Sequence, residues 1–193
     1  MAKSFNLNPN RSLVLLTLLT LTFATLNVSV AHATGMQVTW TGYAKDGKWE
    51  TAANWAFGNV PGPTDLVSIS GPVTVSLSSS VTIAALVIQA PAVLVCSSPC
   101  AISSGISNYG TVNNYGLITD LSGGTIDNFG GTINNSGSII NYNTSTNSGT
   151  ITNHYGGNLR SMGGITNSGV ITNSCGGTVS GTVSGASVNT QKC

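Results

Sequence analysis

Charged side chains are the scarcest class in this sequence. The 193 residues include only six Lys or Arg and five Asp or Glu, which together make 6% of the chain. A surface that binds nucleic acid needs clustered Lys and Arg to neutralise phosphates, and the sequence has no such cluster. We therefore expect no nucleic-acid partner, and only weak electrostatic attraction toward other partners.

Residues that perform acid–base or metal chemistry are also rare. Glycoside hydrolysis generally uses two carboxylates about 5–9.5 Å apart, and elimination chemistry needs a base with cationic or metal support. The repeats offer only Asp120, Asp127, His154 and Arg160. There is no Ser-His-Asp order, phosphate-binding glycine loop or metal-ligand spacing. We expect a non-enzymatic protein without metal or cofactor, and a polysaccharide-degrading β-helix enzyme is the remaining enzymatic alternative.

Long apolar runs are missing apart from one near the start. Lys3 and Arg11 precede an apolar run from Leu13 to Leu26, and the small-residue site Ala31-His32-Ala33 follows it. This pattern predicts a secretory signal over residues 1–33. An uncleaved anchor is the alternative, but the run is shorter than the roughly 20 residues that a membrane span needs. We expect a secreted or cell-surface protein with no membrane span after cleavage.

Cysteine is limited to four residues, and all of them lie beyond the predicted signal. They are Cys96, Cys100, Cys175 and Cys193. An even count in an oxidising compartment favours two disulfides, and the pairing that closes local loops joins Cys96 to Cys100 and Cys175 to Cys193. The alternatives are a redox pair or a metal site, but three residues separate the first pair where a thioredoxin-type motif has two. The second bridge is expected to hold the tail over the last coil.

A repeated phrase dominates what the sequence does contain. It consists of an aliphatic residue, Asn two places later and Gly four places later. It occurs at Ile106-Ser107-Asn108-Tyr109-Gly110, Val112-Asn113-Asn114-Tyr115-Gly116, Ile126-Asp127-Asn128-Phe129-Gly130, Ile133-Asn134-Asn135-Ser136-Gly137 and Ile165-Thr166-Asn167-Ser168-Gly169. Three phrases make about twenty residues, too few for a core of their own, so units must stack to bury the aliphatic residue.

The phrase predicts an all-β protein, a β-solenoid with about three short strands per coil. Side chains alternate along a strand, so the aliphatic residue and the Asn should both face inward, with the Asn side chains forming amide ladders. Gly and Asn are expected to supply positive φ at the corners. A disordered low-complexity tract is the alternative, although regularly placed Ile and Val are unlike such tracts. Between Ile140 and Ile151 the phrase degrades, which predicts a loop leaving one corner.

The region before the repeats differs in composition. Trp40, Trp49 and Trp55 all fall within sixteen residues. A solenoid leaves its first coil uncovered, and large rings that each bury about 150–250 Å² would form a suitable lid. The sequence therefore divides into a signal (1–33), a Trp-rich N-terminal cap (34–70), first coils (71–104), and the Asn/Gly repeats with the tail (105–193).

This order of motifs resembles a known group of proteins. The residues that carry the likeness are Trp40, Gly42, Trp49, Asn54, Trp55, Pro61, Asp65, Val67 and Ile69. Followed by short strands and Asn-x-Gly repeats, they look like the passenger regions of bacterial autotransporter and filamentous-haemagglutinin-like secreted β-helix proteins. The resemblance implies a surface-exposed or secreted protein with a structural or adhesive role.

Threonines flanking the aliphatic residues suggest a binding surface. The candidates are Thr111, Thr125, Thr132, Thr150, Thr152, Thr166, Thr172 and Thr178. An outward Thr face would suit carbohydrate or ice, although Thr also simply favours strands. Tyr109, Tyr115, Phe129 and Tyr155 would form an exposed aromatic row or pack along one corner. We expect a surface or matrix protein, adhesin-like or self-assembling, with further copies of itself or extracellular glycans as partners.

Overall fold

The computed structural model describes residues 35–120 and 123–193 of the chain. The predicted secretory signal over 1–33 lies outside the described residues. Nineteen strands and two short 3-10 helices make up the regular structure of this part. Among the described residues, no helix has the length and apolar character needed to cross a membrane.

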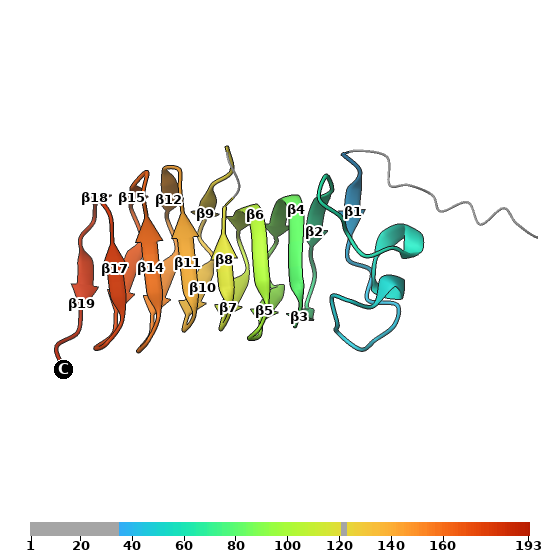
Figure 1. Cartoon of the computed structure of the whole chain (residues 1–193), viewed down its shortest axis with the longest axis horizontal. Helices are drawn as coiled ribbons and strands as arrows, with labels where there is room; N and C mark the ends of the chain where they lie inside the picture. Colours follow the sequence, from blue (N-terminus) through green and yellow to red (C-terminus); the bar gives the residue numbers. More distant parts are fainter. Residues whose placement is uncertain (1–34, 121–122) are drawn as a thin grey trace, which may run out of the picture. The chain divides into compact units, whose positions relative to one another are not determined.

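The strands form a parallel β-solenoid of about six turns, which confirms the predicted fold (Figure 1). The first face contains β1 (Gln37–Thr39), β2 (Leu66–Ile69), the second halves of β4 (Ser80–Ile88) and β6 (Ala101–Asn108), β9 (Ile126–Asn128), β12 (Ser145–Asn147), β15 (Ile165–Asn167) and β18 (Val183–Gly185). The second face contains β3 (Thr74–Leu77), β5 (Val93–Cys96), β7 (Thr111–Asn114), β10 (Thr132–Asn135), β13 (Thr150–Asn153), β16 (Val170–Asn173) and β19 (Val188–Thr190). The third face contains the first halves of β4 and β6, β8 (Leu117–Thr119), β11 (Ser138–Asn141), β14 (Asn158–Ser161) and β17 (Thr178–Ser180). Each coil visits the three faces in this order.

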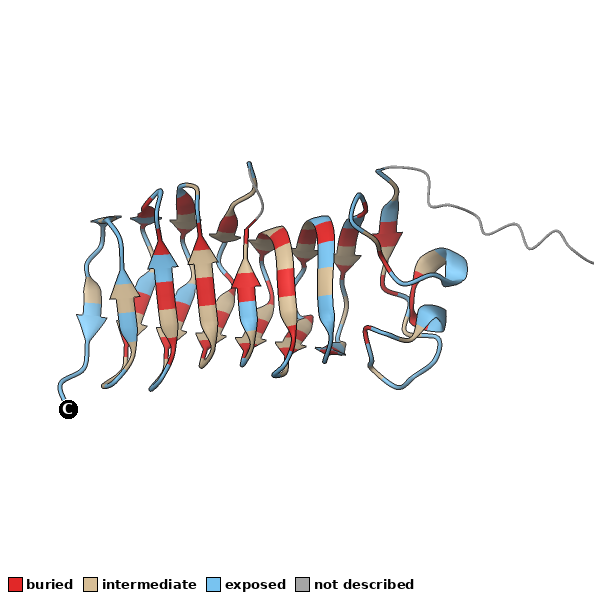
Figure 2. Cartoon of the chain, viewed as in Figure 1, coloured by how far each residue is buried: buried red, intermediate tan, exposed pale blue. Residues whose placement is uncertain are grey.

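The core is a set of aliphatic columns that run through the coils. On the second face, Val112 pairs in register with Leu94 on one side and with Ile133 on the other, and all three are buried. Buried residues alternate with exposed and half-buried ones along most strands (Figure 2). Each such side chain contributes roughly 1.5–3 kcal/mol when fully buried, so the stacking of coils supplies the core that one coil lacks.

Asparagine forms buried ladders at two of the three corners. Between the first and second faces, the Nδ2 of each Asn donates to the Oδ1 of the next over 2.7–2.8 Å, through Asn108, Asn128, Asn147 and Asn167. Between the second and third faces, an equivalent ladder with distances of 2.7–2.8 Å runs through Asn114, Asn135, Asn153 and Asn173. The third corner carries Ser104, Asp120, Asn141 and Ser161 in place of a continuous Asn ladder.

The expectation that corner Gly and Asn adopt positive φ holds only in part for the repeated phrase: Gly130 has φ 81°, whereas Gly110, Gly116, Gly137, Gly169 and the described Asn residues do not have positive φ. Among the described residues, the only non-glycine positions with positive φ are Lys45 and Phe57, and Gly137 and Gly149 are not among the positive-φ glycines. Instead, a Cβ at Gly137 would overlap the carbonyl oxygen of Gly116 in the preceding coil. Glycine is required at this corner because the coils approach too closely for any side chain.

The loop predicted between Ile140 and Ile151 is also absent from this part of the chain. The segment stays within the coil as β12, which pairs with β15 and places Ser145 opposite Ile165. Backbone pairing and the Asn147 rung of the ladder hold the segment in place although its aliphatic residue is missing. Ser145 is 5% exposed and lines an internal cavity of about 20 Å³.

A Trp cluster covers the first coil, as predicted. The Trp55 ring lies edge-on to Trp40 and Trp49, with centroids 4.9 and 4.6 Å away, and its Nε1 donates to the Trp49 carbonyl oxygen over 2.7 Å. The surrounding chain includes η1 (Ala52–Asn54) and η2 (Ala56–Gly58). The cap continues two faces, because β1 pairs with β2 and Lys48 forms a bridge with Ser76 of β3.

Candidate binding face

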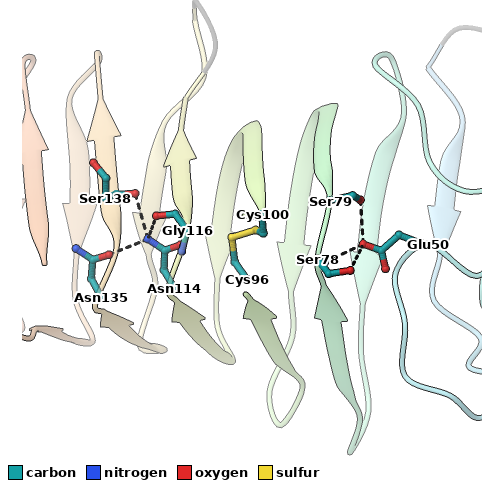
Figure 3. Close-up of a disulfide and its surroundings, with 9 residues drawn as sticks. All are labelled: Glu50, Ser78, Ser79, Cys96, Cys100, Asn114, Gly116, Asn135 and Ser138. Carbon is teal, nitrogen blue, oxygen red and sulfur yellow. Dashed lines mark hydrogen bonds between the residues drawn. A yellow bond between two sulfur atoms is a disulfide. The ribbon is translucent and has the colours of Figure 1, made fainter. Parts of the chain in front are cut away.

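Both predicted disulfides form, so these four cysteines supply neither a redox pair nor metal-binding thiolates. Cys96 and Cys100 are bonded with Cα atoms 5.5 Å apart, and Cys175 and Cys193 with Cα atoms 5.0 Å apart. Cys96 lies one coil before Asn114 in register, so the first bridge occupies the corner just before the second ladder begins (Figure 3).

The second bridge joins the tail to the coil on which the tail stacks. The tail forms β19, which pairs with β16 and extends the second face by one strand. It therefore covers the edge of β16, in line with the expected placement over the last coil, and leaves its own edge open. Backbone pairing explains this placement, because extended chain next to an open strand gains a ladder of hydrogen bonds.

The two carboxylates of the repeat region are occupied by structural hydrogen bonds. Asp120 is 3% exposed at the third corner and accepts bonds from the Tyr142 and Asn143 backbone N–H groups and from the Asn143 side chain, over 2.8–3.2 Å. Asp127 lies on the first face and accepts bonds from the Thr125 hydroxyl and the Thr146 N–H, both over 2.6 Å. Asp120 thus occupies the corner position that Asn141 occupies one coil later.

The remaining ionisable candidates are scattered over the solenoid. His154 follows the Asn153 rung at the corner between the second and third faces, and Arg160 is an exposed residue of β14 on the third face. In the described residues there is no group of three or more His, Cys, Asp or Glu side chains that could hold a metal ion. A depression of about 370 Å³ on the first face is lined by residues that do not titrate: Gln37, Leu66, Val67, Ser68, Ala85, Val87 and Gln89.

The structure gathers only some of the predicted binding threonines on one face. Thr111, Thr132 and Thr150 form one column on the second face, because β7, β10 and β13 pair in register. Thr152 and Thr172 form the adjacent column of the same face. Thr125 and Thr166 lie along the first face and Thr178 on the third, so these three are separated from the rest.

From β3 to β19 the outward side chains of the second face are uncharged, and we call this set the neutral face; Lys48 of the cap, which bridges to Ser76, lies at one end of it. Its members are Thr74, Ser76, Val93, Val95, Thr111, Asn113, Thr132, Asn134, Thr150, Thr152, Val170, Thr172 and Asn189. The first face carries Asp127 and the third carries Arg160, so the other two faces each include a charge. Sequence reasoning missed the contributions of Asn113, Asn134 and the valines, although their alternation with buried residues was a usable signal.

Aromatic residues border the neutral face at both of its corners. Tyr109 and Phe129 stack with ring centroids 5.4 Å apart at the corner with the first face. Tyr115 and Tyr155 lie at the corner with the third face and are 54% and 79% exposed. The expected single aromatic row is therefore divided into two groups on opposite sides of one face.

Comparisons of the chain with protein-family models, with curated protein sequences and with solved structures gave no match.

Proposed function

We propose that this chain is a secreted, non-enzymatic surface or extracellular-matrix protein whose solenoid presents repeated columns of neutral side chains. The observation that carries the proposal is the neutral face, a regular array of Thr, Ser, Asn and Val over successive coils. Flat arrays of this kind suit contact with an extended partner, whereas an enzyme needs a concave site with convergent ionisable groups.

The disulfides support the extracellular part of the proposal. Disulfides persist in oxidising compartments and are rare in the cytosol, and both pairs of cysteines are bonded here. The predicted secretory signal over residues 1–33 would direct export to such an oxidising compartment. The resemblance to autotransporter passengers and filamentous-haemagglutinin-like proteins would make the role adhesive, and it stays a hypothesis.

Self-association is the second form that the proposal takes. β17, β18 and β19 are the terminal strands of their faces, and each pairs with a strand on one side only. Unpaired backbone groups at such edges favour pairing with another chain. Assembly through these edges would build a matrix without any further binding site.

Two measurements test the proposal. We expect antibodies to detect the protein in the medium or on intact cells, with all four cysteines resistant to alkylation until they are reduced. Size-exclusion chromatography and electron microscopy of residues 34–193 then test assembly. A strictly monomeric particle at high concentration would exclude the proposal that the protein assembles into a matrix. Protein confined to the cell interior with reduced cysteines would contradict the proposal as a whole.

A further inference from the structure

We infer that the neutral face binds a neutral polysaccharide, an extended sugar polymer without acidic groups. This inference rests on the proposed extracellular function and deepens it by naming the class of ligand.

The absence of charge on the neutral face limits the partners that it can bind. No member of the neutral face is ionisable, so it has nothing to pair with phosphates, sulfates or carboxylates. Partners that depend on such groups, including nucleic acids and acidic polymers, bind mainly through Lys and Arg. A neutral surface removes this attraction and leaves hydrogen bonding and apolar contact as the sources of affinity.

The neutral face carries hydrogen-bonding groups that both donate and accept. Thr hydroxyls donate and accept, and Asn amides offer both donors and acceptors, which matches a partner made of many hydroxyl groups. The Thr methyl groups and the side chains of Val93, Val95 and Val170 add apolar surface between these polar groups. Sugar rings have the same mixed character, with hydroxyl groups around their edges and C–H groups across their faces.

The outward groups of the neutral face repeat from coil to coil. Parallel strands lie about 4.8 Å apart, and outward residues two places apart along a strand are separated by about 6.6 Å. The Thr111, Thr132 and Thr150 column and the Thr152 and Thr172 column therefore offer equivalent groups at regular intervals. A polymer with repeating units can use several of these groups at once, which gives affinity through many weak contacts.

The aromatic residues lie along the borders of the neutral face. Rings with exposed surface stand at both corners of the neutral face, and Tyr109 and Phe129 are already stacked on each other. Tyrosine provides large, rigid contact area at low entropic cost, and its hydroxyl also hydrogen-bonds. The polar centre with aromatic borders is the arrangement expected for holding a sugar chain across the face.

The test compares two double variants that differ only in the face they alter. Thr132→Lys with Thr150→Lys changes adjacent coils of the neutral face, where Thr132 is half-buried and Thr150 is exposed. Thr146→Lys with Thr166→Lys is the matched control on the first face, where Thr146 is half-buried and Thr166 is exposed. Circular dichroism and thermal unfolding establish that both variants fold. Co-sedimentation with cellulose, chitin and starch, and with alginate as the acidic comparison, measures binding.

We expect the unmodified protein to sediment with at least one neutral polysaccharide. The neutral-face variant should lose affinity on the order of tenfold, the value for losing two hydrogen-bonding contacts, while the first-face control retains it. Binding to no neutral polysaccharide, equal losses in both folded variants, or binding to alginate alone would each overturn the inference. Thermal hysteresis without polysaccharide binding would also overturn it and assign the face to ice. Each of these results leaves the cellular location and assembly state intact, so failure of the inference is distinguishable from failure of the proposed function.

Discussion

Asparagine is the residue that connects the sequence repeat most directly to stability. Each buried ladder Asn receives a hydrogen bond from one coil and donates to the next, which satisfies polar atoms that burial would otherwise penalise. The first rung of the ladder between the first and second faces lacks one of these two bonds. Asn108 Oδ1 has no partner, because the residue one coil earlier in register is Ile88, which has no donor to offer.

Removing a central rung should therefore cost far more than removing its exposed neighbour. Asn135→Ala leaves Asn153 Oδ1 without its donor from the preceding coil and removes one of the acceptors of the Asn114 side chain. We expect the free energy of unfolding to fall by about 1–3 kcal/mol, the cost of an unsatisfied buried group. Urea unfolding checks this value.

Asn134→Ala is the matched control for this prediction. Asn134 is half-buried on the neutral face and bonds only to Asn113 over 2.9 Å. Its removal should change the free energy of unfolding by no more than about 0.5 kcal/mol, as for most surface substitutions. Equal effects of the two substitutions would show that the ladder contributes nothing beyond ordinary surface hydrogen bonds.

At the scale of elements, one acidic residue stabilises the cap internally and a second joins the cap to the first coil. Asp46 accepts hydrogen bonds from the Thr51 hydroxyl, the Lys48 N–H and the Asn54 side chain, which lower its pKa to about 2. Glu50 accepts bonds from the Ser78 N–H and the hydroxyls of Ser78 and Ser79 (Figure 3). Burial raises the pKa of Glu50, but these donors outweigh burial and hold the pKa below its ordinary value.

The cap should consequently loosen in acid. The folded pKa of Asp46 lies below its ordinary value of 3.8, so its contribution to stability is complete above that value and is lost as the pH falls toward about 2. We expect Trp fluorescence to report cap opening over this range. Asp46→Asn should weaken the cap at neutral pH and remove the contribution of Asp46 to the acid response, while that of Glu50 remains. A wild-type cap that is equally stable at pH 5 and pH 2 would refute this assignment.

At the scale of the whole solenoid, stability is distributed along one dimension. Each coil contacts only its neighbours, so a coil with neighbours on both sides is held more firmly than one with a single neighbour. Inward residues of the early coils, such as Leu86, Leu94 and Ile102, are 0% exposed, whereas Val179, Val183 and Val188 in the last strands are only partly buried. The edge strands β17, β18 and β19 should therefore open first.

Native-state hydrogen exchange tests this gradient. We expect amides of β4, β5 and β6 to open with free energies near that of global unfolding, and those of β17 to β19 with much smaller values. Hydrogen exchange of a Cys175→Ser, Cys193→Ser variant provides the control, because loss of the bridge should accelerate exchange at β19 and leave β5 unchanged. Uniform exchange along the chain would mean that the coils unfold as a single cooperative unit.

Much of the fold could be predicted because the repeat is a local signal. Spacing alone gave three strands per coil, the inward aliphatic and Asn positions, and the Trp cap. The prediction was wrong where contacts between coils decide the outcome. Gly137 is needed to avoid the Gly116 carbonyl oxygen, and Ser145 stays in the core because pairing with β15 holds it there. Neither contact can be read from neighbouring residues in the sequence.

The candidate site shows the same division. The sequence by itself determined that the outward positions are rich in Thr, and it favoured the disulfide pairing that the structure shows, because these depend on composition and on short separations. Only the tertiary structure decided that Thr111, Thr132 and Thr150 share a column while Thr125 and Thr166 lie on another face. The reason is that face membership depends on where each coil turns, and the turn positions are set by register with the adjacent coils.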